Sequence, residues 1–343
     1  MLNLLKSLFF IFFISISYSK SLYIKGLGKI KVCKLKNNEV IKIYNQTITL
    51  KDLKPYINLA KTLNEKDIKV VLSGAILDKL VEKNIKNNKE IDIAYYLFEK
   101  TSPQIALNYL SKKSKILKKG NVCKILYNIT LNNLENAKVT LDNIDKILSN
   151  PIKYCKKANL SLDDCEKQVE VLKKLKLNIE NSIKPSLFRY KTLISKIYVP
   201  KRTYLKTLYN LFKNSDLNTL KSLVATYRIY NVPLYLLRYK NGKLVDLLTN
   251  KTLDEKRVLR GYVIYGYRYP IKFYKIKNYL KRKQKPFVIL ENITYDSKLT
   301  FDVCTLIALK KINRYAYRLL REAKNNICVD LNKLEILKKD LAN

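Results

Sequence analysis

The chain begins with a short apolar leader, and this feature constrains the fold most because it determines where folding takes place. Lys6 precedes the apolar run Leu8 to Ile14, and Ser17 and Ser19 form a small-residue cleavage pattern. This order is typical of a secretory signal peptide, which we predict to be cleaved near Ser19. The run is shorter than the ~20 residues that span a bilayer, so we favour cleavage over retention as an anchor. We therefore expect a periplasmic or secreted protein of the cell envelope.

Six cysteines follow the leader, and an oxidising compartment would allow them to form disulfides. Six cysteines permit 15 pairings. Cys155 and Cys165 flank a short segment between two helical patterns, so we predict a bridge between them. Cys304 and Cys328 could pair only if the helix predicted between them breaks, because 24 helical residues span ~36 Å. No C-x-x-C motif is present, which argues against a redox-active dithiol and a zinc ribbon.

The chain contains no histidine and no tryptophan. The lack of histidine excludes Ser-His-Asp and Cys-His catalytic arrangements and removes the commonest zinc ligand. No other catalytic constellation is recognisable in the sequence. We therefore expect a protein that is not an enzyme and that carries no cofactor and no metal.

Lysine and arginine outnumber aspartate and glutamate by 68 to 28, which gives a formal net charge of +40. A genome rich in A and T would raise the lysine content without any function. Selection for an anionic partner would have the same effect. The positions of the arginines favour selection for a partner in the second half of the chain. All eleven lie at or after Arg189, together with 17 of the 26 tyrosines.

The fold class predicted from these patterns is α+β. Pro185 falls where the composition changes, and we place a domain boundary there. The predicted order is a signal peptide (residues 1–19), a short β segment (20–50), a helical domain (51–184) and a basic, tyrosine-rich mixed α/β domain (185–343).

Local patterns support this order. Ile41 and Ile43 alternate with polar residues as in a strand, and Ser102 before Pro103 is typical of a helix start. The helix that starts there should continue to Lys118 and end at Gly120. The stretch 126–151 is repeat-like and resembles a degenerate tetratricopeptide unit, although a plain helical bundle would bury the same apolar stripe.

In the second half, strands are expected where apolar residues cluster between turn signals, and helices where they recur every three or four residues. The expected strands are 192–199, 234–239, 243–248, 261–274 and 287–290, and the expected helices are 203–212, 217–226, 301–323 and one from Leu331. Asn241-Gly242 predicts a hairpin between the second and third strands.

The stretch Tyr227 to Pro233, followed by the strand Leu234 to Leu237 and by Asn241-Gly242, resembles the second half of a thioredoxin-like domain. The resemblance is local to about residues 193–248. It implies a cis bond between Val232 and Pro233, which would make Pro233 a structural residue, and a first strand at 193–199. Where that family has two reactive cysteines, this chain has Pro200 to Thr203, so the resemblance implies the fold without redox chemistry. An unrelated mixed sheet would give the same pattern.

Tyrosines alternate with basic residues in the strand region near residue 265, and a basic run follows it. A strand over 261–269 would place Tyr265, Tyr267 and Tyr269 on one face, where their rings could stack on bases or sugars while neighbouring cations bind phosphates or carboxylates. Alternatively, these tyrosines pack the sheet against helices. The candidate binding residues are Arg260, Tyr262, Tyr265, Tyr267, Arg268, Lys281, Arg282 and Lys283.

We therefore predict an exported scaffold or assembly factor that binds an anionic polymer or an acidic protein through its C-terminal domain. Nucleic acid and an anionic membrane surface would suit the same charges. Two alternatives are a thioredoxin-like domain without redox cysteines in a secretion or redox pathway, and a DNA-handling component of an uptake or conjugative transfer apparatus.

Overall fold

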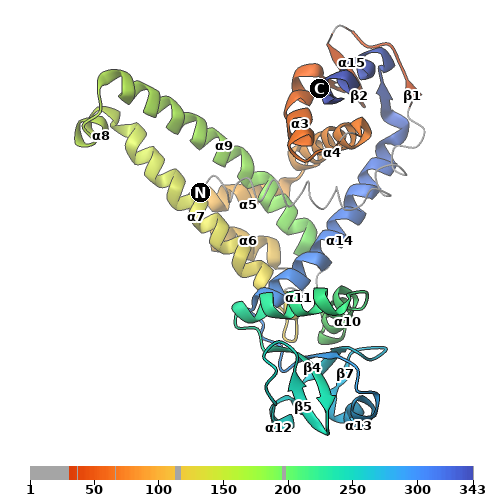
Figure 1. Ribbon diagram of the computed structural model, residues 1–343. Coiled ribbons are helices and arrows are strands. Elements are labelled where there is room, and N and C mark those ends of the chain that lie inside the picture. The colour runs from red at the N-terminus through yellow and green to blue at the C-terminus, as the bar shows by residue number, and fades with distance from the viewer. Residues whose placement is uncertain (1–30, 37, 66, 113–116, 195–197, 343) are drawn as a thin grey trace. The chain divides into compact units, whose positions relative to one another are not determined.

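A computed structural model describes residues 31–342, except residues 37, 66, 113–116 and 195–197 (Figure 1). The predicted signal peptide and residues 20–30 lie outside the described residues. The fold is α+β, as predicted, with two β-sheets. The chain divides into two compact units, the first formed by Met1–Asp92 with Leu309–Asn343 and the second by Ile93–Ala308. Within the described ranges, no helix is both long and apolar enough to cross a membrane.

The first unit is built from both ends of the chain. Its sheet has the order β1-β9-β2-β3, in which β9 runs parallel to β1 and antiparallel to β2. The β segment predicted before residue 50 is confirmed for its described part, but the strand that joins it from the far end of the chain was not predicted. The elements are β1 (Lys31–Val32), β2 (Glu39–Ile43), β3 (Gln46–Thr49), α3 (Leu50–Thr62), α4 (Ile68–Lys86), β9 (Ile327–Val329) and α15 (Leu331–Ala342).

Covalent and polar contacts join the two chain segments of this unit. A disulfide links Cys33 to Cys328. The carboxylate of Asp330 accepts a hydrogen bond from the backbone N–H of Leu35 at 3.0 Å. The ammonium group of Lys333 donates to the carbonyl oxygens of Leu35 and Glu39, each at 2.9 Å. These contacts satisfy backbone groups of the loop before β2.

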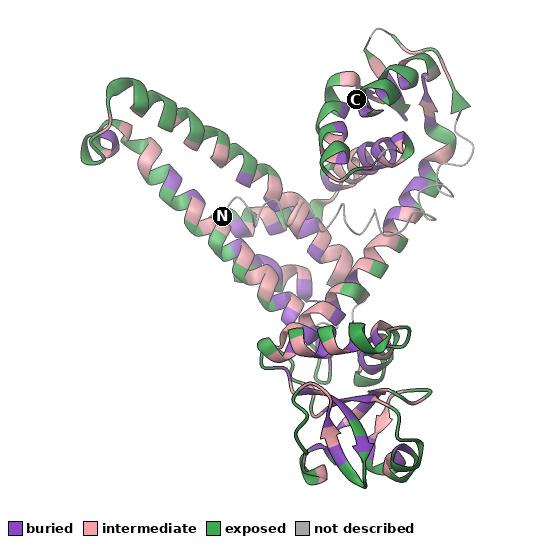
Figure 2. Ribbon diagram, viewed as in Figure 1, coloured by how far each residue is buried: buried purple, intermediate pink, exposed green. Residues whose placement is uncertain are grey.

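The second unit starts with helices. They are α5 (Lys89–Lys100, which crosses the unit boundary), α6 (Pro103–Ser111), α7 (Ile125–Ser149), α8 (Pro151–Lys157) and α9 (Leu162–Ile194). Ser102 caps α6 as expected, but this helix ends at Ser111, well before Lys118. Helices α7 and α9 pack as a long pair, and α8 lies at its end, where Cys155 and Cys165 form the predicted disulfide (Figure 1). The half of the pair near α8 is mostly exposed (Figure 2).

Pro185, where the sequence predicts a domain boundary, lies inside α9. The helix continues through it because Ile183 and Leu187, on either side of the proline, are both buried, so packing stabilises the helix before and after it. The strand predicted over 192–199 is also wrong in its described part, since residues 192–194 are the last turn of α9 and Tyr198 and Val199 are in neither helix nor strand.

The rest of the second unit is an α/β region around a sheet of order β5-β4-β8-β6-β7, in which every pairing is antiparallel. The hairpin predicted at Asn241-Gly242 is confirmed, and both residues have positive φ. The elements are α10 (Lys201–Phe212), α11 (Leu217–Ile229), β4 (Leu234–Lys240), β5 (Lys243–Asp246), α12 (Glu255–Val258), β6 (Tyr262–Tyr265), β7 (Ile271–Lys272), α13 (Phe273–Lys283), β8 (Phe287–Leu290) and α14 (Lys298–Ala323, which crosses the unit boundary).

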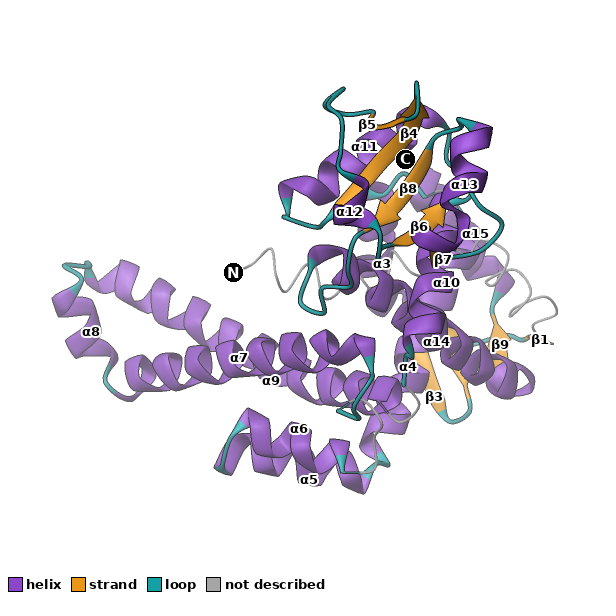
Figure 3. Cartoon of the chain, turned by 90° about the horizontal axis from the view of Figure 1, so that it is seen from below, coloured by secondary structure: helices purple, strands orange, loops and turns teal. Residues whose placement is uncertain are grey.

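Helices cover both faces of this sheet (Figure 3). One face carries Leu236, Ile264 and Val288, which share a core with α10, α11 and the start of α14. The other face carries Val263 and Phe287, which share a core with α12 and α13. A third disulfide, between Cys123 and Cys304, fixes the segment before α7 to α14.

The bond between Val232 and Pro233, which the thioredoxin resemblance implied to be cis, is trans. Pro233 has a structural position, because its carbonyl oxygen accepts the N–H of Glu291 at 2.9 Å where β4 begins. The resemblance itself stays a prediction.

Candidate anion-binding surface

Helix α13 presents a basic face because its apolar residues recur at helical spacing. Phe273, Ile276 and Leu280 are buried against the sheet. The other side of the helix is exposed and ends in three consecutive cations. Positive charges in a last turn also interact favourably with the helix dipole. The three cations are the predicted binding residues Lys281, Arg282 and Lys283.

An aromatic cluster lies beside this basic turn. The Tyr267 ring contacts the rings of Tyr269 and Tyr279 edge-on, with centroids 5.2 and 5.3 Å apart. The Arg268 guanidinium lies 5.7 Å from the Tyr267 ring and 5.5 Å from the Tyr269 ring, and the Lys283 ammonium lies 5.9 Å from Tyr279. These distances allow cation–π contacts. We name this group the α13 surface; it consists of Tyr267, Arg268, Tyr269, Tyr279, Lys281, Arg282 and Lys283.

The predicted stacking platform of Tyr265, Tyr267 and Tyr269 is wrong. Strand β6 ends at Tyr265, and Gly266 follows with φ at 92°, which interrupts the two-residue alternation. Tyr265 packs against the core beneath α10 and α11, whereas Tyr267 packs against the core beneath α13. The two rings therefore belong to opposite faces of the sheet.

Arg260 and Tyr262, two further predicted residues, form a separate group. Tyr262 pairs with Lys272 between β6 and β7, and the Lys272 ammonium lies 3.9 Å from the ring centroid. The Lys201 ammonium, at the start of α10, lies 4.6 Å from the same centroid. Lys272 also donates to the carbonyl oxygen of the exposed Arg260. We name these four residues the Tyr262 cluster.

The environment of Tyr262 favours its ionised form. Burial by itself raises the pKa of the phenol. Hydrogen bonding to Lys201 and the positive charges of Lys201 and Lys272 outweigh burial, so the pKa of Tyr262 is lowered from its ordinary value. In contrast, burial raises the pKa of Tyr204, another phenol of the unit, to about 12.

The α/β region has few carboxylates to balance its cations. Residues 199–308 contain 22 lysines and arginines but only seven aspartates and glutamates. Six of the seven carboxylates have partners within the protein. Two of them, Asp216 and Asp254, cap helices. The other four form the ion pairs Asp246–Arg228, Glu291–Arg257, Glu255–Lys277 and Asp302–Lys298. Among the described residues, no cation of the α13 surface or the Tyr262 cluster makes an ion pair. Both groups therefore carry uncompensated positive charge.

Four members of these groups were not predicted as binding residues, and Lys201 is the one that no sequence signal indicated. It is 61 positions from Tyr262, and only the packing of α10 on β6 brings them together. Lys272, Tyr269 and Tyr279 lie within the basic and aromatic run that the sequence singles out, so that run was the available signal for them.

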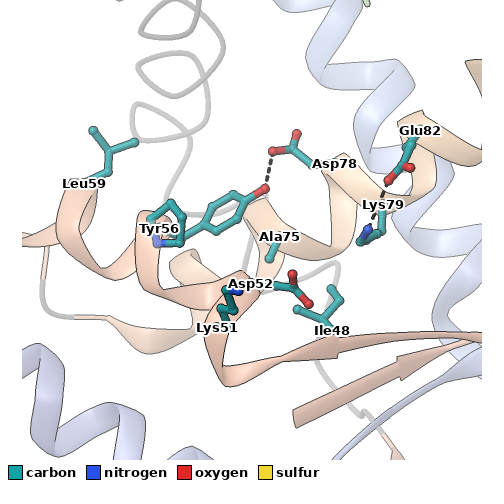
Figure 4. Close-up of a pocket in the computed structure, with 10 residues that line it drawn as sticks. Ile48, Lys51, Asp52, Tyr56, Leu59, Ala75, Asp78, Lys79 and Glu82 are labelled. Carbon is teal, nitrogen blue, oxygen red and sulfur yellow. Dashed lines mark hydrogen bonds and ion pairs between the residues drawn. The ribbon is translucent and has the colours of Figure 1, made fainter. Parts of the chain in front are cut away.

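The first unit contains a hollow of about 470 Å³ between α3 and α4 (Figure 4). The Tyr56 hydroxyl donates to Asp78 at 2.6 Å, and Glu82 accepts from Lys79 at 3.1 Å. The N–H of Thr49 lowers the pKa of Asp52, so its carboxylate is stabilised within the fold. The carboxylates around the hollow are thus already bonded within the protein.

Within the part of the chain that the structure describes, no group of three or more cysteine, aspartate or glutamate residues is arranged to hold a metal ion. The sequence matches no protein-family model, curated protein or solved structure. The geometry and charge of the two basic groups are therefore the features that indicate what the protein binds.

Proposed function

We propose that this protein is an exported, non-enzymatic scaffold or assembly factor of the cell envelope that binds an anionic polymer or acidic protein through the α13 surface. One observation carries this proposal: exposed cations and tyrosine rings from α13 and from the segment between β6 and β7 contact one another, while the nearby carboxylates have other partners. A polyanion that displaces counterions from such a surface would gain affinity that depends strongly on salt.

The compartment follows from two features. The three disulfides Cys33–Cys328, Cys123–Cys304 and Cys155–Cys165 use every cysteine in the sequence and fit an oxidising environment. The apolar leader before Ser19 supplies the signal for export. A bacterial periplasm or the exterior of the cell satisfies both.

Binding of the mature chain, residues 20–343, to single-stranded DNA and to polyglutamate over a salt series tests the proposal. The triple variant Lys281→Gln, Arg282→Gln, Lys283→Gln should weaken binding. With DNA, it should reduce the slope of log affinity against log salt by about 2, since each phosphate contact on a single strand contributes about 0.7.

A matched control removes the same charge elsewhere: Lys153→Gln, Lys156→Gln, Lys157→Gln on α8, where all three lysines are exposed. If both triple variants lose affinity equally, net charge alone drives binding and the α13 surface has no special role. If neither polymer binds with steep salt dependence, the electrostatic mechanism is wrong.

One observation also favours the DNA-handling alternative. Tyr269 is 47% exposed and lies 5.5 Å from the Arg268 guanidinium, an arrangement in which a base can stack on the ring while the cation binds its phosphate. Tyr269→Ala should then weaken binding to single-stranded DNA about tenfold or more while leaving polyglutamate binding unchanged. Equal effects on both polymers would exclude base stacking.

A further inference from the structure

We infer that the Tyr262 cluster is a second binding site, specific for a small oxyanion of the phosphate class. The site lies at the β7 edge of the sheet and does not depend on the α13 surface. Lys201 belongs to α10, Arg260 to the turn before β6, Tyr262 to β6 and Lys272 to β7.

Two ammonium groups, those of Lys201 and Lys272, lie beside one phenol ring, that of Tyr262. Tyr262 and Lys272 are cross-strand neighbours in β6 and β7, so their side chains lie on the same face of the sheet. That face is covered by α10, whose first residue is Lys201. The two ammonium groups lie 4.6 and 3.9 Å from the same ring centroid and both act on the Tyr262 phenol, so they are at most about 8.5 Å apart.

This closeness is unfavourable without an anion. Lys201 and Lys272 repel each other, and the backbone carbonyl oxygen of Arg260, which accepts a hydrogen bond from Lys272, carries only a partial negative charge. In the described part of the chain, no carboxylate pairs with any of these three residues. The Tyr262 phenol relieves part of the repulsion, which explains why its pKa is lowered.

The two helices that begin here increase the positive potential. Helix α10 starts after Pro200 and α13 starts after Lys272, and neither start has a side-chain cap. Elsewhere α3 and α11 start with capping side chains, Thr49 and Asp216. Cations at the start of a helix oppose its dipole, and a bound anion would reverse the sign of that interaction.

A phosphate group fits these donors better than a carboxylate does. Two ammonium groups and a phenol require several acceptor oxygens in different directions, which a tetrahedral dianion offers and a planar carboxylate does not. A bound anion offsets the charges of the two lysines, so the phenol keeps its proton and its O–H donates a hydrogen bond to the anion. A free phosphate and the phosphoryl headgroup of a lipid or polymer share this chemistry.

Calorimetric titration of the mature chain with inorganic phosphate at physiological salt tests the site. Lys201→Gln and Lys272→Gln should each weaken phosphate binding about tenfold or more, the usual effect of losing a charge-assisted hydrogen bond. Lys272→Arg, which keeps the charge, should retain most of the affinity and shows that a loss in Lys272→Gln is not a loss of folding. Lys153→Gln on α8, an exposed lysine outside both basic groups, is the matched control and should leave phosphate binding unchanged.

Glycerol phosphate and vesicles that contain phosphatidic acid, tested in parallel, distinguish a free ligand from a lipid headgroup. Binding to either that depends on Lys201 and Lys272 supports the site. If wild-type protein binds none of these probes, or if the Lys→Gln variants bind phosphate as tightly as the wild type does, the Tyr262 cluster is not an anion site. Because the polymer assays depend on the α13 surface, failure of one proposal leaves the other standing.

Discussion

Removal of the Cys33–Cys328 bridge by Cys33→Ser with Cys328→Ser should destabilise the first unit more than loss of the Cys155–Cys165 bridge destabilises the second. The two half-cystines are 295 positions apart. In the unfolded chain the covalent path between these two cysteines is shorter than 295 residues. The intact bridge between Cys123 and Cys304 bypasses 181 positions of that interval. About 115 residues remain in the loop, for which the loss of chain entropy corresponds to about 5 kcal/mol.

The matched comparison is Cys155→Ser with Cys165→Ser, whose loop spans only 10 positions. The same relation gives about 3 kcal/mol for that bridge. Unfolding of both variants in guanidinium chloride, followed by circular dichroism, measures the difference. Hydrogen exchange of peptides that cover β2 and β9 should show that the loss in the first variant is local to the sheet they form.

If the Cys33 and Cys328 variant loses no more unfolding free energy than the Cys155 and Cys165 variant does, loop length does not set the contribution of these bridges. It would mean that the loop before β2 and the strand β9 stay together without the bridge, held by Asp330 and Lys333. Non-reducing peptide mapping of the wild-type protein checks the premise, because it should recover the three disulfide-linked peptide pairs that the structure contains and no others.

Two further predictions concern single residues. Gly266→Ala should destabilise the second unit by more than ~1 kcal/mol, because φ is 92° and an added Cβ would lie 2.5 Å from Phe287 Cβ; an unchanged melting temperature would contradict this. The N–H of Leu35 and, more weakly, Lys333 lower the pKa of Asp330, so its stabilising effect should be complete above its ordinary value of 3.8 and should be lost as the pH falls through the lower folded value. Asp330→Asn should therefore be less stable than the wild type at neutral pH and equally stable in strong acid, which unfolding at a series of pH values measures.

Several elements could be predicted because their signals are local. Asn241 and Gly242 adopt positive φ and turn the chain between β4 and β5, as the dipeptide predicts. Cys155 and Cys165 are joined because the short segment between two helices already brings them close. Ser102 precedes a helix, as predicted, because its hydroxyl accepts the backbone N–H of Ile105 three residues later.

Other elements could not be predicted because distant segments decide them. Pro185 is a local signal for a break, but the burial of Ile183 and Leu187 keeps α9 continuous. Tyr265 and Tyr267 were expected on one face, and a single left-handed glycine between them placed their rings in different cores. In both cases tertiary packing outweighed the pattern of neighbouring residues.

Residue type and near neighbours specify the class of fold, the helix starts and turns, the short-range disulfide and the excess of positive charge, so the sequence was enough to predict them. Contacts between distant segments specify which ends of the chain share a sheet, which cysteines pair over long distances and which cations lack a carboxylate. Those features depend on contacts between segments such as Lys201 and Tyr262, whose distance apart in the sequence carries no local signal.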